Sequence, residues 1–359
     1  MSAPNNSPNA PISPSRMIWL RLRRHKLAMI GGWILIFLYV VGLFAGFVAP
    51  YSHERQDRER FFHSPTMPRF SGWRLVVPRY EQTSIGPFRY QAKLDDTRPV
   101  QLFVRGDKYK LFGCIPATVH LFGQSDDQHP VYLFGTDQQG RDIFSRILYG
   151  SQISLSIGLI GIVLSFSIGM LAGGFSGYTG GRTDDVIMRV CELIMSIPGL
   201  YLIMALRATF PPKTSSTEAY LLIIVILSFI SWAGTARVIR GMSLSLRERQ
   251  FVLSARALGQ STGKIIVRHI LPSTFSYVIV AATLSVPYYI LGEAVLSFLN
   301  VGIQEPDASW GNMLNAAQNT EYLRSYPWLL APGAAIFITV LAFNFLGDGL
   351  RDAVDTKSQ

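Results

Sequence analysis

Cysteine and histidine side chains are common nucleophiles and metal ligands, so their spacing is a first test for chemistry. Cys114 lies in a polar stretch and Cys191 in an apolar one, so no disulfide framework is expected. The six histidines are His25, His53, His63, His120, His129 and His269. They show no HxxxH pair and no Cys/His spacing typical of zinc, and we therefore predict no metal site.

The segment GQSTGKI, which begins at Gly259, has glycines and a lysine in the manner of a phosphate-binding loop. That loop needs four residues between its glycines and a hydroxyl residue after its lysine. Here three residues separate Gly259 from Gly263, and Ile265 follows Lys264. No strand is predicted before the segment, so we do not expect the chain to bind ATP by this route.

Two carboxylates and two prolines lie in or near apolar stretches. Glu192 and Glu293 would be costly inside a membrane and are candidate sites, unless they lie near helix ends, where the cost is small. Pro198 and Pro287 interrupt helical hydrogen bonding; such breaks flank the path in many transporters, but they also occur as kinks without function. Pro198, Pro287 and Glu293 are therefore candidate pathway or kink residues.

The composition indicates that lipid surrounds much of the chain. Hydrophobic residues make up 49% of it and charged residues only 16%, whereas soluble domains carry about 25% charged residues. Lys and Arg number 33 against 23 Asp and Glu, a net charge of +10. Such an excess suggests nucleic acid in a soluble protein, but in a membrane protein it orients helices, so we expect the bilayer and no nucleic acid as partner.

Six apolar runs are long enough to suggest membrane spans. They are Leu27–Ala49, Ile153–Phe175, Ile187–Leu206, Tyr220–Trp232, Phe275–Leu299 and Trp328–Leu346. The fourth is short unless it extends through Thr235 to Val238. The expected fold class is an α-helical polytopic membrane protein of about six transmembrane helices.

Basic residues orient these spans. The basic segment before the first run could belong to a signal peptide, but about 23 apolar residues are too many for one, so the run is read as an uncleaved span. The segment Ala236–Pro272 carries seven basic residues, whereas the loops expected outside carry Lys213 and Arg324. By the positive-inside rule, both termini are then cytoplasmic.

The stretch between the first two spans differs in composition from the rest. Charges of both signs mix with frequent prolines, and Val100–Val104 and Tyr109–Phe112 have strand-like patterns. About 100 residues are too many for a plain loop, so we predict a β-rich extracytoplasmic insertion. The expected division is a tail at 1–26, the first helix at 27–49, the lobe with an interfacial helix at 50–150, a transmembrane core at 151–349 with a cytoplasmic loop at 236–272, and a tail at 350–359.

A stripe of small residues follows the second span at intervals of four. It consists of Gly161, Ser165, Gly169, Gly173 and Gly177. Small side chains allow a neighbouring helix to approach closely. The stripe predicts helix packing inside the bundle and would equally suit a dimer interface.

The cytoplasmic loop carries the most informative pattern. Phe251, Ser254, Ala255 and Leu258 share one helical face, and Gly259 suits a helix end that needs positive φ. A second short helix, Ser261–Ile270, would be closed by Pro272. We predict a short helix with a small, knob-like face that docks into a groove on a cytoplasmic partner, and nothing suggests that this helix-turn-helix binds DNA.

The sequence SARALG at Ser254–Gly259, with RHILP at Arg268–Pro272, resembles the EAA motif of permease subunits in ABC importers. More narrowly, the chain is similar to the C-type permease of the oligopeptide/dipeptide/nickel group. Further matching blocks are Arg21–Pro50, GTDQQGRD at Gly135–Asp142 with Ser145 and Arg146, LSFL at Leu296–Leu299, SWGNML at Ser309–Leu314 and GDGLRD at Gly347–Asp352. The resemblance covers residues 16–50 and about 133–355.

The resemblance implies a larger assembly in a bacterial inner (plasma) membrane. A second, B-type permease pairs with this chain, two ABC ATPase subunits bind ATP and Mg²⁺, and an extracytoplasmic substrate-binding protein or lipoprotein delivers cargo. The chain itself binds no cofactor and catalyses no covalent reaction. Its coupling helix is moved as a lever when the ATPases close. The coupling residues implied are Phe251, Ser254, Ala255, Arg256, Ala257, Leu258, Gly259, His269 and Pro272.

The chain departs from the family pattern in three places. Tyr51–Tyr132 replaces a short connection, Ser254 stands where alanine is commoner, and Gln250 stands near a common glutamate or tyrosine. The docking role is compatible with these changes. Peptides are the commonest cargo of the group, but nickel, glutathione-like molecules, oligosaccharides and peptide antibiotics use the same scaffold.

Two other classes of function compete with this interpretation. An ATP-independent channel or secondary transporter is disfavoured because the chain shows no inverted repeat and no span rich in paired charges. A membrane-anchored enzyme would need a catalytic lobe, but the lobe has no nucleophile elbow or metal spacing. Its polar candidates are His53, His63, His120, Asp57, Asp95, Asp96 and Ser84. The lobe could instead help to dock the binding protein or line the external mouth.

Overall fold

The computed structural model describes residues 14–126, 128–209 and 215–355. Residues 1–13 of the expected N-terminal tail, and Lys213, lie outside the described residues. Within them, five helical stretches are long and apolar enough to span a membrane. They comprise α2 (Lys26–Leu43), α4 (Ile143–Thr179), α7 (Ser216–Leu246), Thr262–Phe298, which contains α10 (Leu271–Phe298), and Pro327–Val354, which contains α13 (Ala331–Val354). The predicted polytopic helical fold is confirmed.

The third apolar run is not the continuous helix that the sequence suggested. It forms α5 (Gly181–Ser196) and α6 (Gly199–Ala208), whose axes differ by 92°. Pro198, one of the candidate kink residues, lies at the break between the two helices, because α5 ends at Ser196 and Ile197 is extended. The steric restriction that proline places on the preceding residue explains this break. With this bent pair counted as one span, the described residues contain six candidate spans.

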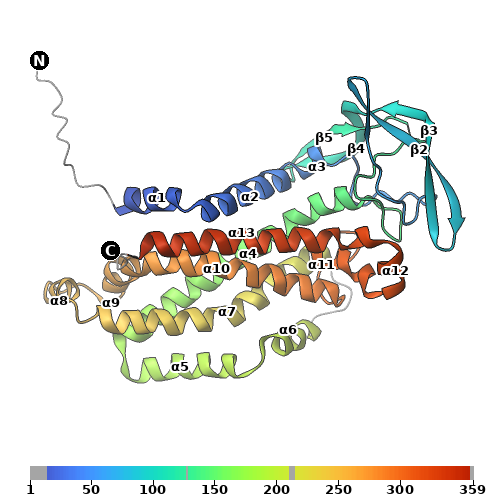
Figure 1. The fold of residues 1–359 in the computed structure, drawn as a ribbon. Coiled ribbons are helices and arrows are strands. Elements are labelled where there is room, and N and C mark those ends of the chain that lie inside the picture. The colour runs from blue at the N-terminus through green and yellow to red at the C-terminus, as the bar shows by residue number, and fades with distance from the viewer. Residues whose placement is uncertain (1–13, 127, 210–214, 356–359) are drawn as a thin grey trace, which may run out of the picture.

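The long helices lie side by side, and the two ends of the bundle differ (Figure 1). One end carries the β-strands. The other carries α8 (Gln250–Ala257) and α9 (Thr262–Ile265), next to α1 (Pro14–Arg24) and the end of α13. There the Arg21 guanidinium donates a hydrogen bond to the Asp355 carbonyl at 3.3 Å. Short elements complete the strand-bearing end: α3 (Ala45–Val48), α11 (Trp310–Met313), η2 (Leu314–Gln318), α12 (Thr320–Ser325) and η3 (Pro327–Leu330).

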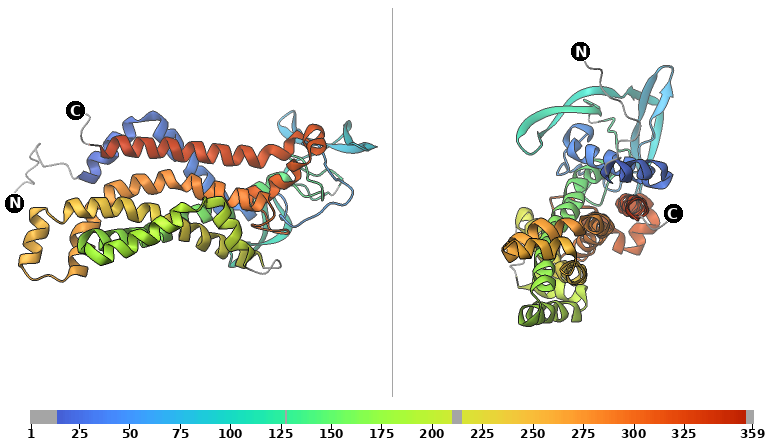
Figure 2. Two further views of the ribbon diagram at one scale, coloured as in Figure 1. Left: turned by 90° about the horizontal axis from the view of Figure 1, so that it is seen from below. Right: turned by 90° about the vertical axis from the view of Figure 1, so that its left-hand side faces the viewer.

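Seen along the helix axes, the bundle is layered, with α2 towards one edge and α5 at the other (Figure 2, right). The α4 helix crosses the middle and packs against α2, α7 and α10, while α13 packs between α2 and α10. The buried core is mainly aliphatic and includes Ile157, Leu227 and Ile290 from three of these helices. At 1.5 Å per residue, α4 is about 55 Å long, so it extends well beyond a hydrocarbon core of about 30 Å.

The predicted β-rich insertion is confirmed, and it consists of two separate antiparallel sheets. β1 (Arg69–Ser71), β2 (Arg74–Ile85) and β3 (Phe88–Pro99) form one sheet in chain order. β4 (Gln101–Leu111) and β5 (Ile115–Gly123) form a two-stranded ribbon. The two runs expected to be separate strands, Val100–Val104 and Tyr109–Phe112, fall largely within the single strand β4.

Aromatic contacts join this lobe to the bundle. The Phe62 ring stacks on that of Tyr326 with centroids 4.1 Å apart, and the Phe88 N–H donates to the Tyr326 hydroxyl at 2.9 Å. On the ribbon side, Phe112 contacts Phe44 at the end of α2 with ring centroids 5.3 Å apart. The lobe is therefore attached to both the first span and the segment before the last one.

Candidate functional site

The α8–α9 segment extends beyond the bundle at the end opposite the strands (Figures 1 and 2). Arg249 is extended at the start of α8, and Gly259 ends the helix with φ +74°, which confirms the expected positive φ. The N–H of Gln260 donates to the Ala255 carbonyl at 3.2 Å, so the turn satisfies a helix-end carbonyl. Ser261, again extended, precedes α9. The segment is thus a well-defined helix-turn-helix.

The exposure of α8 corrects the predicted docking face. Ala255 is only 4% exposed, because with Val252 it packs against Ile265 and Ile266. The expectation that Ala255 shares an outward face with Leu258 is therefore wrong. Leu258 is 80% exposed, and further exposed residues are Phe251, Ser254, Arg256, Ala257 and Gly259. The outward surface is formed by these residues.

The second half of the loop also differs from expectation. Pro272 does not close a helix: a π-helical turn, η1 (Ile266–Ile270), joins α9 directly to α10. In this wider turn the Leu271 N–H donates to the Ile266 carbonyl five residues earlier. The widened turn lets the helix pass through the position where proline cannot donate. His269 lies on η1 and its Nε2 is 3.0 Å from the Gln260 side-chain oxygen, so it braces the turn after α8.

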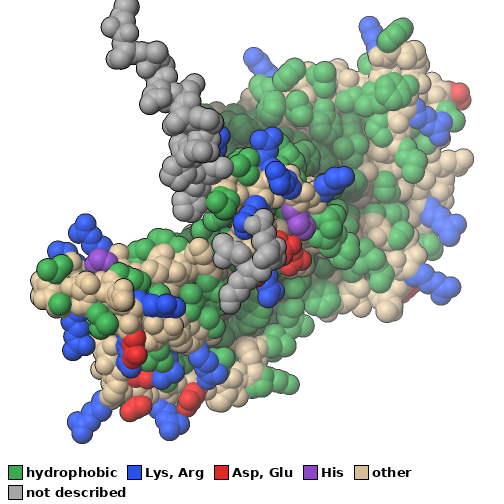
Figure 3. All heavy atoms as spheres, turned by 60° about the vertical axis from the view of Figure 1, so that its left-hand side comes forward, with side chains coloured by type: hydrophobic (Ala, Val, Ile, Leu, Met, Phe, Trp, Pro, Cys, Tyr) green, Lys and Arg blue, Asp and Glu red, His purple; other side chains and the backbone are tan. Residues whose placement is uncertain are grey.

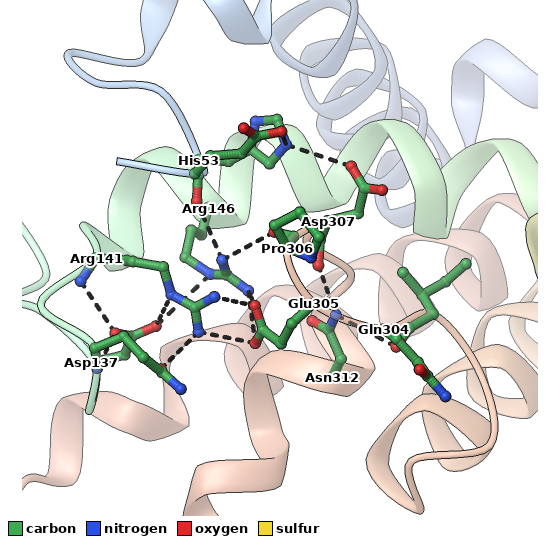
Figure 4. A network of polar contacts seen from close by, with 12 residues as sticks. His53, Asp137, Arg141, Arg146, Gln304, Glu305, Pro306, Asp307 and Asn312 are labelled. Carbon is green, nitrogen blue, oxygen red and sulfur yellow. Dashed lines mark hydrogen bonds and ion pairs between the residues drawn. The ribbon is translucent and has the colours of Figure 1, made fainter. Parts of the chain in front are cut away.

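At the other end, the GTDQQGRD block folds as a turn over the loop between α10 and α11 (Figure 4). Arg141 binds two carboxylates: its Nε donates to Asp137 at 2.7 Å and its two terminal nitrogens both donate to Glu305. Arg146 adds contacts to Glu305 at 3.3 Å and to the His53 carbonyl at 3.1 Å. Because Arg141 and Arg146 are 5% and 1% exposed, these are buried charges that need these partners.

A further pair extends the network. His53 Nε2 lies 3.4 Å from Asp307, and the hydrogen bond with His53 lowers the pKa of the Asp307 carboxyl. The network therefore ties the start of the lobe, the N-terminus of α4 and the loop before α11. It also borders a cavity of about 320 Å³. Glu305 is not among the residues predicted from the sequence, where its one signal is a Glu-Pro pair close to the SWGNML block.

The two candidate carboxylates have opposite environments. Glu293 is fully buried in α10 and accepts hydrogen bonds from the Ser154 hydroxyl of α4 at 3.0 Å and the Ser297 hydroxyl at 2.7 Å. Ser154 also accepts from the Trp310 N–H, so this cluster joins α4, α10 and α11. Glu192 is half exposed on α5 and pairs with Arg189 at 3.0 Å. Pro287 lies inside α10.

The small-residue stripe of α4 lies against its neighbours. A Cβ added at Gly169, Gly173 or Gly177 would meet atoms of α7, and one at Gly161 would meet the Tyr289 ring of α10. Ser165 is fully buried. The close packing of α4 on these two helices requires small residues at these positions, whether or not a second subunit is present.

Within the described residues, no group of three His, Cys, Asp or Glu side chains is placed to hold a metal ion. Gly259–Ile265 forms a turn followed by the start of α9. The described part of the chain thus presents two candidate sites, the α8 surface at one end of the bundle and the polar network around Glu305 at the other.

Known proteins match this chain along most of its length. Residues 165–358 match the family described as binding-protein-dependent transport system inner membrane component, and residues 13–65 match the N-terminal TM domain of oligopeptide transport permease C. The dipeptide transport system permease protein DppC of Bacillus subtilis is 33% identical over 347 residues, covering 96% of this chain and 87% of the relative. A putative peptide permease protein of Brucella suis is 40% identical over 245 residues, 68% of this chain and 79% of the relative. The oligopeptide transport system permease protein OppC of Bacillus subtilis is 38% identical over 242 residues, 67% of this chain and 77% of the relative.

Proposed function

The chain belongs to the family of binding-protein-dependent transport system inner membrane components, and we propose that it is one of two permease subunits in an ATP-driven importer of dipeptides or oligopeptides. The observation that carries the cargo class is its similarity, along almost the whole chain, to a dipeptide permease. As a permease subunit it would form half of the translocation path. ATP and Mg²⁺ would be bound by partner ATPase subunits, which would perform the hydrolysis.

The proposed contact with the ATPase is the outward surface of α8. Leu258 is 80% exposed at the end of a short helix, while Val252 and Ala255 fix that helix to the chain's own core. A rigidly held helix with an exposed apolar residue suits a groove on a partner, as helix-in-groove recognition requires. The side chains we assign to this contact are Phe251, Ser254, Arg256, Ala257 and Leu258, with Gly259 and His269 shaping the turn.

The orientation follows from the distribution of basic residues. Seven Lys and Arg residues lie between Ala236 and Pro272, at the α8 end of the bundle. We assign that end, with both termini, to the cytoplasm, and the β-strands to the extracytoplasmic side. There the lobe would face the substrate-binding protein. With this orientation, we propose that the chain is divided into two cytoplasmic tails, a first helix, an extracytoplasmic lobe and a permease core.

The composition of the purified assembly tests this function. Tagged chain extracted in mild detergent at native expression should retain a second permease and ATPase subunits, identified by mass spectrometry. Isolation of this chain alone, in several gentle detergents, would instead favour an ATP-independent channel or secondary transporter. Uptake of a labelled dipeptide by the reconstituted assembly, with and without ATP, then tests the cargo class.

One substitution tests the contact assigned to α8. Leu258→Arg places a charge on the outward surface without disturbing the buried Val252 and Ala255, so ATPase binding and uptake should be lost while the protein still inserts. Phe70→Arg is the control, because Phe70 is 82% exposed on β1 at the opposite end. Normal ATPase binding by inserted Leu258→Arg protein would overturn the assignment.

A further inference from the structure

The α5 helix has three different side-chain stripes along its length. One is buried against α4 and α7 and includes Cys191 and Ile194. A second is apolar but exposed: Val186, Val190 and Leu193 have 64%, 45% and 66% of their surface exposed. The third is polar, and its members are Asp185, Arg189, Glu192 and Ser196, all exposed. Because α5 lies at the edge of the bundle, both exposed stripes are uncovered in this chain (Figure 2).

The polar stripe borders a groove of about 610 Å³ between α5 and α7. Its charged lining comes from Asp184, Asp185, Arg189 and Glu192 on α5 and from Arg237 and Arg240 on α7. The volume falls within the range of about 300–1,000 Å³ typical of small-molecule sites. At the end of the molecule that carries α8, basic and acidic side chains are intermixed on the surface (Figure 3).

One ion pair fixes the walls of this groove. The Arg240 guanidinium donates to both oxygens of Asp184, at 2.6 and 2.5 Å, and the Ser176 hydroxyl of α4 donates to the same carboxylate. Asp184 therefore ties three helices together. In contrast, Arg189 and Glu192 pair at 3.0 Å with 83% and 50% of their side-chain surfaces exposed, so they can exchange this contact for another partner at little cost.

The two exposed stripes identify what each side of α5 faces. Arg189 is adjacent in sequence to Val190, and Glu192 to Leu193, so charged and apolar exposed residues lie at the same heights along the helix. Charged side chains in a span face water or a protein interior, whereas lipid accepts apolar ones. Since α5 exposes an apolar and a charged stripe at the same level, its apolar stripe faces lipid and its charged stripe faces water.

We infer that the α5–α7 groove lines the aqueous exit of the translocation path and contacts the charged groups of the passing peptide. This inference rests on the proposed function as a peptide importer. A peptide carries an ammonium and a carboxylate, and the groove offers Asp185 and Glu192 for the first and Arg189 and Arg237 for the second. Residues of the stripe recur about every 5.4 Å, comparable to the length of one or two extended peptide residues. Such a surface contacts the termini and the charged side chains of peptides of different sequence, each contact being weak.

Thiol accessibility tests which stripe faces water. The assembly is purified with Cys114→Ser and Cys191→Ala as background and reconstituted in nanodiscs. Single cysteines then replace Arg189 or Glu192 in the polar stripe, and Val190 or Leu193 as matched neighbours. A membrane-impermeant maleimide should label the polar positions at least about tenfold faster, because reaction requires a hydrated thiolate. Equal rates, or faster labelling of the apolar positions, would overturn the inference.

Transport kinetics test contact with the peptide. In reconstituted assembly, Glu192→Ala should raise the KM for a lysine-containing dipeptide, and Arg189→Ala that for a glutamate-containing one, each by about threefold, the effect of one exposed ion pair. Arg324→Ala, far from the groove on α12, is the control. Unchanged KM values in both variants would overturn the peptide contact. If the wild-type assembly moves no peptide, the proposed function fails, whereas the labelling pattern still decides whether the stripe faces water.

Discussion

At the scale of single residues, Glu305 holds two buried guanidinium groups that come from the start of α4 and the turn before it. Removing its charge would leave Arg141 and Arg146 with Asp137 as their remaining carboxylate. Breaking a buried ion pair by changing one partner costs about 3–5 kcal/mol, and because Glu305 itself is 48% exposed we expect about 2–3 kcal/mol for Glu305→Gln. A lower melting temperature in detergent, followed by tryptophan fluorescence, would register this loss.

The lobe offers a matched control for Glu305→Gln. Glu81 pairs with Lys93 at 2.6 Å, but both side chains are about half exposed, so Glu81→Gln should cost less than about 1 kcal/mol. If the two glutamate variants melted at the same temperature, the polar network would not be a source of stability. The comparison needs no assumption about transport.

Asp142 gives the same region a dependence on pH. Burial raises the pKa of its carboxyl to about 7, although hydrogen bonds from Ser145 lower it. The folded protein therefore keeps a proton that the unfolded chain loses near its ordinary value of 3.8. This stabilisation is complete below about pH 4, declines by up to about 1.4 kcal/mol per pH unit as the pH rises towards 7, and does not change above that value.

The variant Asp142→Asn should remove this decline. Asparagine keeps an acceptor for the Ser145 N–H, which Asp142 binds at 2.8 Å, but it has no charge to bury. Melting temperatures of the variant and the wild type should therefore diverge between pH 4 and 7, with the variant more stable at the higher pH. Parallel curves over that interval would show that Asp142 is ionised in the folded protein.

The sequence identified the block that contains Arg141 and Arg146, but not their partner Glu305. Arg141 and Glu305 are 164 positions apart, so only the fold brings them together. The error at Ala255 has a similar cause. Helical spacing grouped it with Leu258, but packing of α9 and η1 against α8 covers Ala255 and leaves Leu258 exposed. Burial by a neighbouring element cannot be read from one helix's periodicity.

At the scale of elements, the close approach of α4 and α7 depends on glycine. A Cβ at Gly173 would lie within 3.0 Å of backbone atoms of Ala236, which cannot move aside as a side chain can. Gly173→Ala should therefore destabilise the bundle by about 1–3 kcal/mol or more. Gly241 on α7 is the control: no described atom lies within 4 Å of an added Cβ, so Gly241→Ala should be neutral or stabilise by about 0.5–1 kcal/mol.

Detergent stability and expression level of these two variants measure the difference. Equal tolerance of both alanines would mean that α4 and α7 are further apart than the structure places them. The stripe itself was visible in the sequence, because its period of four is independent of its partner. The helix that lies against the stripe could not be predicted, since Gly161 faces α10 while Gly169, Gly173 and Gly177 face α7.

Hydropathy located the spans but not their ends or breaks. The second apolar run was expected from Ile153, whereas α4 begins ten residues earlier, because the polar first turns are stabilised by the Asp142 cap and by Arg146. Local sequence also misjudged one proline near a helix junction. Pro272 was expected to close a helix, whereas η1 leads directly into α10, which contains Pro272 in its first turn. Apolar length predicts that a helix exists, whereas its ends depend on contacts made elsewhere.

At the scale of the whole molecule, the lobe and α8 lie at opposite ends of helices tens of ångströms long (Figure 1). Removing part of the lobe should therefore leave the proposed ATPase contact intact. A deletion of about residues 60–130 would be too broad, because His63 and Thr66 hydrogen-bond to Thr136 and Tyr132 next to the polar network. The three-stranded sheet is a better unit to remove.

Sheet register supplies the junction for this deletion. Val76 pairs with both Arg69 and Pro99, so these two residues lie two strand spacings apart, about 10 Å. A linker of about four glycine and serine residues can therefore replace Arg69–Pro99. The shortened chain should insert and retain its ATPase subunits at wild-type yield, while losing the Phe88 contact with Tyr326 and, with it, some stability at that end. Affinity for the binding protein should fall if the sheet helps to dock it. Loss of the ATPase subunits from a stably inserted shortened chain would place the sheet and α8 on the same side of the membrane, contrary to the proposed topology.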